Sequence, residues 1–398
     1  MAEDVFWLVF DDVGAGFAGL DPSRVTPRVS MRLSSPQLSA GASAWLRYDD
    51  LTVDRAQCWD QDGALLADVT FPARPVRSSL PYDTREVADL PEPSIQAALD
   101  SGRLSPCYLV VERQGSDIAT AYCCSRIRAS GLVFSRFGQG PRGSAPDVVA
   151  AAVADDPSLL RRFSDESEQT TRFDDEIEIE LKLTLTGDTR PWDLARDLAA
   201  VVQDRGLPGF IPDVGNEFQR WSYEQHTYEV SGRPEETGYV AFMTTQQGRY
   251  HVKYKFFVED ALRRVELFDE DLDLRPADFE PFLREKLPDV RFRALPHLTR
   301  SRFDVNVESE ETGHYYGLEA DEVWANGQVL RQLEIEYHKS RACLGVVPET
   351  IEPGLLRLTN EAEALLGGWD VAFDRGYLSK LTFLRQAAGD LVAVSPES

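Results

Sequence analysis

The feature that most constrains the fold is a strict alternation of charged and apolar residues in the segment EIEIELKLTL, residues 176–185. Only a β-strand sorts such a pattern into two faces, because side chains at i and i+2 point to the same side. One face is entirely Ile and Leu, whereas the other carries Glu178, Glu180 and Lys182. A helix would scatter these charges around its axis. For one strand alone, the simplest interpretation is a half-exposed strand with a solvated polar face.

The same alternation, with charges of both signs, recurs along the C-terminal half of the chain. The polar positions that share a phase are His251, Lys253 and Lys255; Arg264 and Glu266; Arg300, Arg302, Asp304 and Asn306; Glu319 and Asp321, after an expected break at Gly317; and Gln332, Glu334, Glu336 and His338, after the turn Asn326-Gly327. This spacing predicts an antiparallel sheet whose apolar face packs against helices and whose charged face points into a shared space.

Lysine, arginine and glutamate at paired positions on several strands supply what a metal-bound polyphosphate needs. Carboxylates bind a hard divalent cation such as Mg²⁺, which bridges to phosphate oxygens, while Lys and Arg neutralise the remaining negative charge. A lumen of cations alone or carboxylates alone would suffer like-charge repulsion. Mixed charge therefore allows the empty site to remain folded.

The segment Glu178-Ile179-Glu180-Leu181-Lys182 resembles the ExExK signature that opens the CYTH domain, the fold of the triphosphate tunnel metalloenzymes. The resemblance covers roughly residues 174–385, and its further elements follow in the order of the family: the KxK strand at Lys253 and Lys255, the RxE strand at Arg264 and Glu266, the RxR strand at Arg300 and Arg302, the acidic strand at Asp321, the LEIEY-like strand at Glu334 and Glu336, and the C-terminal pair Ser379-Lys380. It implies a closed, eight-stranded antiparallel β-barrel with outer helices, a tunnel that binds a triphosphate in its basic lumen.

The resemblance also implies roles for particular side chains and a cofactor, Mg²⁺ or Mn²⁺. Phosphate oxygens would be held by Lys182, Lys253, Lys255, Arg300, Arg302 and Lys380, with Arg264 as a weaker candidate. The metal ligands would be Glu178, Glu180, Glu334 and Glu336, with Glu266 and Asp321 as candidate additional ligands. The residues expected to carry catalysis are Lys182, Glu180 and Glu336.

Two segments depart from the family pattern. A long connection between Gly187 and Trp221 contains an expected helix at 192–205, and an acidic insertion at 259–296 contains another near 277–287. Both could cover a tunnel mouth and change the substrate. The resemblance therefore bears on the fold more than on the reaction. A third helix, Glu352–Gly367, has one apolar stripe and is expected to pack on the outside of the barrel.

A break in composition divides the chain. All six lysines and all five histidines lie beyond residue 181, and the polar run at 164–171 suggests a linker. We expect an N-terminal domain over 1–165 and the tunnel domain over 174–390, in an α+β protein. The N-terminal domain should be mostly β or α+β, with strands at Val5–Phe10, Val29–Leu33, Ala44–Tyr48, Tyr108–Glu112 and Ile118–Arg128 and one helix at Ser94–Asp100.

Several function classes are disfavoured. A formal GxGxxG at residues 14–19 lacks the following helix that a dinucleotide site requires, because Pro22 and Pro27 interrupt that segment. The net charge of −25, from 42 Lys plus Arg and 67 Asp plus Glu, disfavours duplex nucleic acid as a partner. The five irregularly spaced cysteines suggest neither a disulfide framework nor zinc.

No apolar run approaches the roughly 20 residues that cross a bilayer, and the N-terminus lacks the basic region of a signal peptide. We therefore expect a cytoplasmic protein without membrane partners.

Three functions remain open. The first is metal-dependent hydrolysis of inorganic triphosphate or of a nucleoside or organic triphosphate. The second is an adenylate cyclase that makes cyclic AMP and pyrophosphate in the same lumen, and the third is a non-catalytic polyphosphate- or nucleotide-binding regulator. The N-terminal domain could contact a protein partner or self-associate.

His251 and His338 lie on the charged face of their strands. The aromatic residues that could stack a base near the mouth are Tyr228, Tyr254, Tyr337, Trp221 and Trp324.

Overall fold

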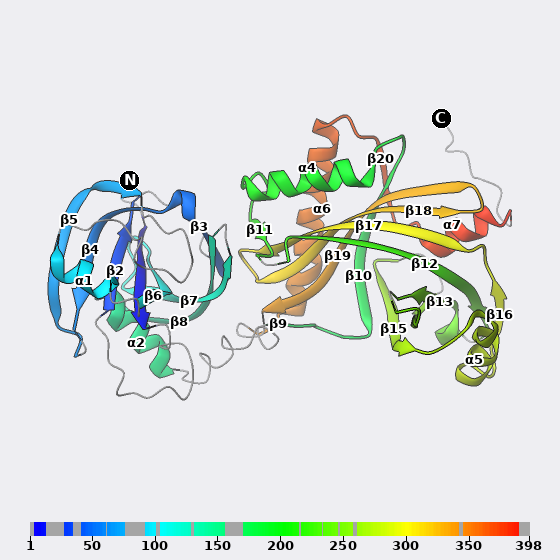
Figure 1. The fold of residues 1–398 in the computed structure, drawn as a ribbon, viewed down its shortest axis with the longest axis horizontal. Helices are drawn as coiled ribbons and strands as arrows, with labels where there is room; N and C mark the ends of the chain where they lie inside the picture. Colours follow the sequence, from blue (N-terminus) through cyan, green and yellow to red (C-terminus); the bar gives the residue numbers. More distant parts are fainter. Residues whose placement is uncertain are drawn as a thin grey trace.

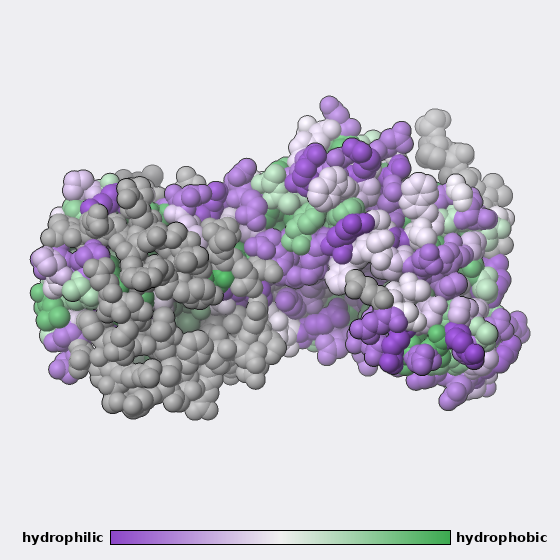
Figure 2. All heavy atoms as spheres, in the orientation of Figure 1, coloured by the Kyte–Doolittle hydropathy of each residue, from purple (hydrophilic) through white to green (hydrophobic). Residues whose placement is uncertain are grey.

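The computed structural model divides into a β-rich N-terminal part and a C-terminal barrel (Figure 1). On the face drawn in Figure 2, polar residues predominate over the barrel half, in keeping with the acidic composition. The residues that the structure describes are 4–12, 28–34, 41–60, 62–75, 92–100, 104–128, 131–155, 170–214, 216–232, 234–245, 247–257, 261–341 and 345–389. The GxGxxG segment, Cys343 and most of the expected linker lie outside these ranges.

Eight of the described strands close into an antiparallel barrel, which confirms the predicted fold class. Their order is β17-β18-β19-β10-β15-β14-β13-β12, and β12 pairs back with β17 from Phe218 opposite Val305 to Gln225 opposite Leu298. The strands are β10 (Ile177–Leu185), β12 (Phe218–Ser231), β13 (Gly238–Thr244), β14 (Tyr250–Phe256), β15 (Arg263–Leu272), β17 (Leu298–Ser309), β18 (His314–Ala325) and β19 (Gln328–Arg341). Four short strands extend this sheet: β9 (Thr170–Thr171), β11 (Phe210–Pro212), β16 (Arg291–Ala294) and β20 (Phe373–Gly376).

The alternation in β10 sorts its side chains as the sequence predicts. The Ile and Leu face is buried against the outer helices α4 (Pro191–Gln203) and α6 (Ile351–Gly368). The charged face points inward, where Glu178, Glu180 and Lys182 are only 3%, 1% and 2% exposed. Charged side chains are almost never buried this deeply unless they are paired.

The other helices of this half also pack on the barrel without covering its mouth. Helix α5 (Phe279–Lys286) lies in the expected acidic insertion and packs Phe279 and Leu283 against the outer apolar face of β13 and β14. Helix α7 (Lys380–Ala387) instead closes one end of the barrel, because its apolar residues pack against inward-facing Leu298, Val323 and Leu330. The barrel is thus a chamber plugged at that end.

The expected break at Gly317 is wrong, because β18 runs without interruption from His314 to Ala325. Gly317 makes room for a neighbour on the next strand. A Cβ atom at this position would lie 2.6 Å from Cε1 of His338. The glycine therefore allows the His338 ring to lie over the strand.

The described residues of the N-terminal part form an eight-stranded antiparallel sheet with a helix against each face, which fits the predicted β-rich domain. The strand order is β3-β8-β7-β6-β1-β2-β4-β5, and β1 packs Phe6 and Leu8 with α1 on one face and Trp7 and Val9 with α2 on the other. The five expected strands are present, and β4, β5 and β8 are additional. The elements are β1 (Val5–Asp12), β2 (Arg28–Leu33), β3 (Ser43–Arg47), β4 (Thr52–Trp59), β5 (Leu65–Pro75), α1 (Pro93–Asp100), β6 (Leu104–Glu112), β7 (Ile118–Arg128), β8 (Gly131–Pro141) and α2 (Ala145–Asp155).

Within the described residues, no helix combines the length and the apolarity needed to span a lipid bilayer.

Candidate active site

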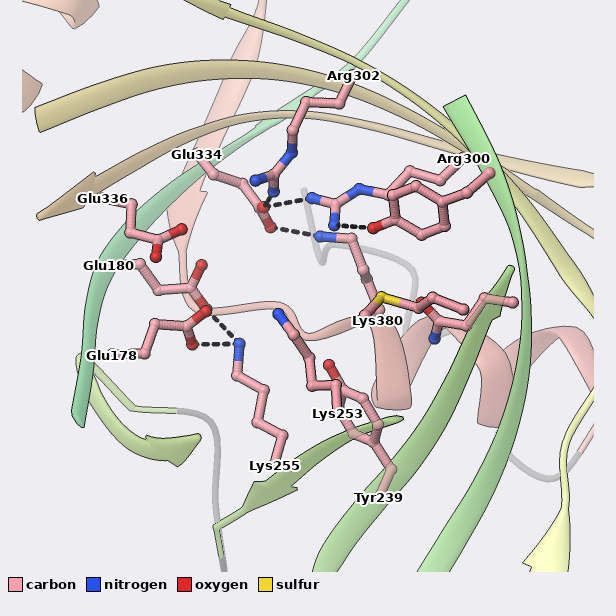
Figure 3. Close-up of a pocket in the computed structure, with 13 residues that line it drawn as sticks. Glu178, Glu180, Tyr239, Lys253, Lys255, Arg300, Arg302, Glu334, Glu336 and Lys380 are labelled. Atoms are coloured by element: carbon pink, nitrogen blue, oxygen red, sulfur yellow. Dashed lines mark hydrogen bonds and ion pairs between the residues drawn. The ribbon is translucent and has the colours of Figure 1, made fainter. Parts of the chain in front are cut away.

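The inward charges of the barrel meet in one chamber (Figure 3). Five cations and four carboxylates line it together with two tyrosines, a glutamine and a methionine: Lys253, Lys255, Arg300, Arg302, Lys380, Glu178, Glu180, Glu334, Glu336, Tyr223, Tyr239, Gln225 and Met243. They come from β10, β12, β13, β14, β17, β19 and the first residue of α7. The closed sheet thus gathers residues that are up to two hundred positions apart in the sequence.

Glu334 is the partner of four cations. The Lys380 ammonium donates to Glu334 Oε1 at 2.7 Å, Arg300 and Arg302 donate to Oε2 at 2.9 and 2.5 Å, and Lys182 also contacts Oε1. Burial opposes ionisation of Glu334, yet these cations outweigh it and hold the pKa of the carboxyl well below its ordinary value. Glu334 is therefore a permanent anion that keeps the cations together.

Glu180 has a similar role on the neighbouring strand β10, where it lies opposite Glu336 and Lys182 lies opposite Glu334. Its Oε1 lies 3.0 Å from the Lys182 ammonium and 3.1 Å from that of Lys255, and it also accepts from Arg264. These cations overcome the cost of burial, so the pKa of Glu180 is also well below its ordinary value. Lys182 and Arg264 are not among the lining residues of the chamber. Both contact Glu180, but they do not line the chamber as the other five cations do.

The paired side chains fill most of the lumen. The open volume is about 20 Å³, and one water molecule requires roughly 10–15 Å³ on the same measure. A triphosphate can enter only if ion pairs between the walls open. The bound anion would then accept from cations that contact Glu334, Glu178 and Asp321 in this structure.

Three carboxylates form a cluster suited to a divalent cation. Oxygens of Glu178, Glu180 and Glu336 all lie within 4.8 Å of one another, and a second group with the same spacing consists of Glu319, Glu336 and His338. Glu336 belongs to both groups, and among the described residues no hydrogen bond or ion pair joins its side-chain carboxyl to another group. A set of carboxylate oxygens, one of them unpaired, fits the ligand preference of Mg²⁺ or Mn²⁺.

Crowding of these carboxyls raises the pKa of two of them. Burial, followed by the charges of Glu180 and Glu266, raises the pKa of Glu178 to about 8, although Lys255 opposes the shift. Burial and the neighbouring Glu319 and Glu178 raise the pKa of Glu336 well above its ordinary value. A raised pKa favours the protonated form of each carboxyl, and a cation bound between them would compete with these protons.

This arrangement predicts that a rise in pH lowers the stability of the metal-free protein and increases the stabilisation that bound metal provides. The folded state retains a proton on Glu178 that the unfolded chain has already released, so the free energy of unfolding should fall as the pH rises toward about 8. Mn²⁺ should stabilise the protein more at about pH 8.5 than at about pH 6, since fewer protons must be displaced. Thermal unfolding with Mn²⁺ and with chelator at both pH values measures this, and an equal Mn²⁺ effect would contradict it.

A wider vestibule of about 630 Å³ adjoins the chamber and shares Tyr223, Met243, Lys253, Arg300 and Arg302 with it. Two large apolar side chains in its wall are exposed, Trp221 at 51% and Phe268 at 43%. The remaining lining residues are Arg220, Ser222, Thr244, Thr245 and His251. The vestibule combines aromatic faces and cationic groups next to the charged chamber. No residue of α4 or α5 lines it.

The other site residues expected from the sequence have the following places. Glu266 pairs with Lys253 at 2.6 Å. Asp321 accepts from Arg300 at 2.9 Å and from Arg302 at 3.0 Å. Glu334 lies in the cation cluster and in neither carboxylate group.

Of the residues considered for base stacking, only Trp221 lines the vestibule. Tyr228, Tyr254 and Tyr337 pack in apolar clusters, and Trp324 donates to Glu322 on the exterior.

Several residues of the site were not predicted as such. Tyr223 and Gln225 come from β12, and Tyr239 and Met243 from β13, two strands whose sequences lack the charged alternation. Glu319 and His338 were noted on the charged phase but not as a ligand pair. The position of Glu319 next to Glu336 and His338 depends on the pairing of β18 with β19, which the sequence does not give.

The fold and the site together define a class: a closed antiparallel barrel with a mixed-charge lumen, the architecture that the CYTH resemblance implies. No family model and no curated protein matches the chain.

Among solved structures, HpAC1 from Hippeastrum, an adenylyl cyclase homologue described as having a dominant triphosphatase activity, matches at 16% identity over 54% of this chain and 98% of its own, with a TM-score of 0.34. The PH1819 protein of Pyrococcus horikoshii matches at 16% identity over 52% and 98%, with a TM-score of 0.31. The RNA triphosphatase Pct1 of S. pombe matches at 14% identity over 41% and 72%, with a TM-score of 0.22. Similarities of this size carry no conclusion about the activity of this chain, and the barrel is established by its own strand pairing.

Proposed function

We propose that the protein is a divalent-metal-dependent hydrolase of a triphosphate that binds in the barrel chamber. The observation that carries this proposal is the placement of the Glu178, Glu180 and Glu336 carboxylates beside five lumen-facing cations. The cations match the charge of a triphosphate, and the carboxylates match the ligand preference of Mg²⁺ or Mn²⁺. A chamber plugged by α7 also limits the access of water from that end.

In this proposal the five cations bind and orient the phosphate chain. Arg300 and Arg302 offer planar guanidinium groups that can bind phosphate oxygens in bidentate fashion, and Lys253, Lys255 and Lys380 act as point charges. Phosphoryl transfer depends mostly on such positioning and charge stabilisation. Lys182 and Arg264 hold Glu180 in place from behind.

A metal ion bound by Glu178, Glu180 and Glu336 would neutralise phosphate charge and lower the pKa of a coordinated water. Glu336 has no cation partner, so its carboxylate is free to turn toward the ion. The Lys255 ammonium now contacts both Glu178 and Glu180. When these carboxylates turn to the ion, Lys255 becomes available to a phosphate oxygen.

The vestibule favours an organic triphosphate over inorganic triphosphate. Exposed aromatic faces beside a phosphate chamber suit a planar ring, and stacking on an aromatic side chain contributes about 1–3 kcal/mol per base. A nucleoside triphosphate fits this description, with its base at Trp221 and Phe268.

The variant Trp221→Ala is therefore expected to raise KM for ATP about tenfold or more, while KM for inorganic triphosphate stays unchanged. Trp221→Phe is the matched control, because it keeps an aromatic stacking face, smaller than indole and without the N–H that donates to Asp304. Steady-state kinetics with both substrates measure the effect. Equal changes for ATP and inorganic triphosphate would show that the vestibule does not bind the base.

Product analysis tests the proposed reaction directly. The protein is incubated with inorganic triphosphate or ATP, in Mg²⁺ or Mn²⁺, and the products are separated by ion chromatography. Orthophosphate release that stops on addition of chelator supports the hydrolase. Cyclic AMP with pyrophosphate would replace it with the cyclase, which the vestibule also accommodates, and binding without any product would favour a regulator.

A further inference from the structure

The N-terminal sheet is docked on the barrel through its edge strand β3, next to the C-terminal end of β17 (Figure 1). The backbone N–H groups of Ala42 and Ser43 donate to the Glu310 carbonyl at 2.6 and 3.1 Å. Gly41 approaches so closely that a Cβ atom there would lie 2.3 Å from the same oxygen. The backbone of one half is thus fitted directly against the backbone of the other.

Side chains complete this contact with an apolar and a charged part. Trp45 is fully buried and packs with Val133 of the N-terminal sheet and with Ile211 and Val214 of the barrel half. Arg205 donates to the Trp45 carbonyl at 2.7 Å. Buried aromatic anchors of this kind are typical of permanent contacts, whereas tethered modules meet through smaller and more polar surfaces.

The charged part brings Arg126 of β7 into the barrel half. Arg126 is 6% exposed, and its Nη1 lies 3.3 Å from Asp213 Oδ1 and donates to the Val214 carbonyl at 3.2 Å. Asp213 is 2% exposed. Removing one partner of such a buried pair leaves an uncompensated charge, which costs far more than the pair itself contributes.

Asp213 and Val214 follow β11 (Phe210–Pro212) and precede β12, which begins at Phe218 and forms part of the vestibule wall. The Asp213 N–H donates to the Asn306 carbonyl at 2.9 Å, and Asn306 Nδ2 donates to the Asn216 carbonyl at 2.8 Å. These bonds fix the entry of β12 against β17. Further along β12, Trp221 donates to Asp304 at 2.7 Å, and the Tyr223 hydroxyl accepts from Arg300 at 2.7 Å.

We infer that the N-terminal domain is firmly docked on the barrel and that Arg126 is a positioning residue. Through Asp213 and Val214 it anchors the start of β12 and so holds Trp221 and Tyr223 in the vestibule. This role goes beyond the proposed function and needs no contact between Arg126 and a substrate.

The test compares the full-length variants Arg126→Met, Arg126→Lys and Asp213→Asn with Arg136→Met, which changes an exposed arginine of β8 in the same domain. Hydrogen exchange of residues 216–225 is the primary measurement. We expect Arg126→Met and Asp213→Asn to accelerate exchange in this segment about tenfold or more, Arg126→Lys to have a smaller effect, and Arg136→Met to have none. Unchanged exchange in folded Arg126→Met and Asp213→Asn overturns the inference.

Kinetics give a second, independent readout. Displacement of the vestibule wall should raise KM for ATP about tenfold and leave kcat within about twofold, because the substitutions change none of the cations or carboxylates that line the chamber. A fall in kcat with KM unchanged would contradict the positioning role. If the wild-type protein turns over no triphosphate, the proposed function fails. The exchange measurement still shows whether Arg126 anchors the start of β12.

Discussion

The variant Glu336→Gln is expected to lose metal-dependent turnover by about a hundredfold to a thousandfold while it folds like the wild type. Glu336 is shared by both acidic groups of the chamber, and a neutral amide cannot replace a carboxylate ligand of Mg²⁺. Since no other described residue pairs with Glu336, its loss leaves no cation uncompensated.

Turnover of a triphosphate in Mg²⁺, together with direct titration of Mn²⁺, measures this effect. Glu349→Gln is a suitable control, because Glu349 is an exposed carboxylate that belongs to neither acidic group. Weakened Mn²⁺ binding in Glu336→Gln with unchanged binding in Glu349→Gln is the expected pair of results. Full turnover and full metal affinity in Glu336→Gln would show that the carboxylate cluster does not bind the metal.

The variant Glu334→Gln should have the opposite profile, with a large loss of stability. Its carboxylate is bonded to Lys380, Arg300 and Arg302 and also contacts Lys182, so the amide would leave buried cations without their common anion. Breaking a buried ion pair by removing one partner costs about 3–5 kcal/mol. We expect the free energy of unfolding to decrease by this amount.

Denaturant titration measures the loss as a lower midpoint with an unchanged slope. Inorganic triphosphate should restore more stability to Glu334→Gln than to the wild type, because a bound anion would supply the missing negative charge. Glu336→Gln, two residues away on the same strand, is the matched control and should unfold at or above the wild-type midpoint. Equal midpoints for Glu334→Gln and the wild type would show that the cations do not depend on this carboxylate.

The contrast between these two glutamates marks the limit of what the sequence predicts. The alternation in β10 and β19 correctly gives the strand type, the inward phase and the gathering of charges in one lumen, because the period of two is a local property of a strand. The CYTH resemblance implies that both Glu334 and Glu336 are metal ligands. Their difference arises from neighbours across the barrel, since Lys380 and Arg300 reach Glu334 but not Glu336.

Other features depend on contacts between distant segments and leave no local signal. Strands β12 and β13 have no regular alternation of charge, so neither Tyr223 nor Tyr239 could be assigned to the chamber. Gly317 was interpreted as a break, although it accommodates the ring of His338 on the next strand. The docking of Arg126 on Asp213 joins residues 87 positions apart and could be found only in the folded chain.

The central claim is that a divalent cation and a triphosphate occupy the chamber together. A crystal structure of the protein with Mn²⁺ and a non-hydrolysable triphosphate, with anomalous data at the manganese edge, tests it most directly. We predict an anomalous peak among Glu178, Glu180 and Glu336, with phosphate oxygens bonded to Arg300, Arg302 and Lys380 in place of Glu334. A triphosphate bound outside the barrel, or manganese absent from the chamber at saturating concentration, would contradict the account.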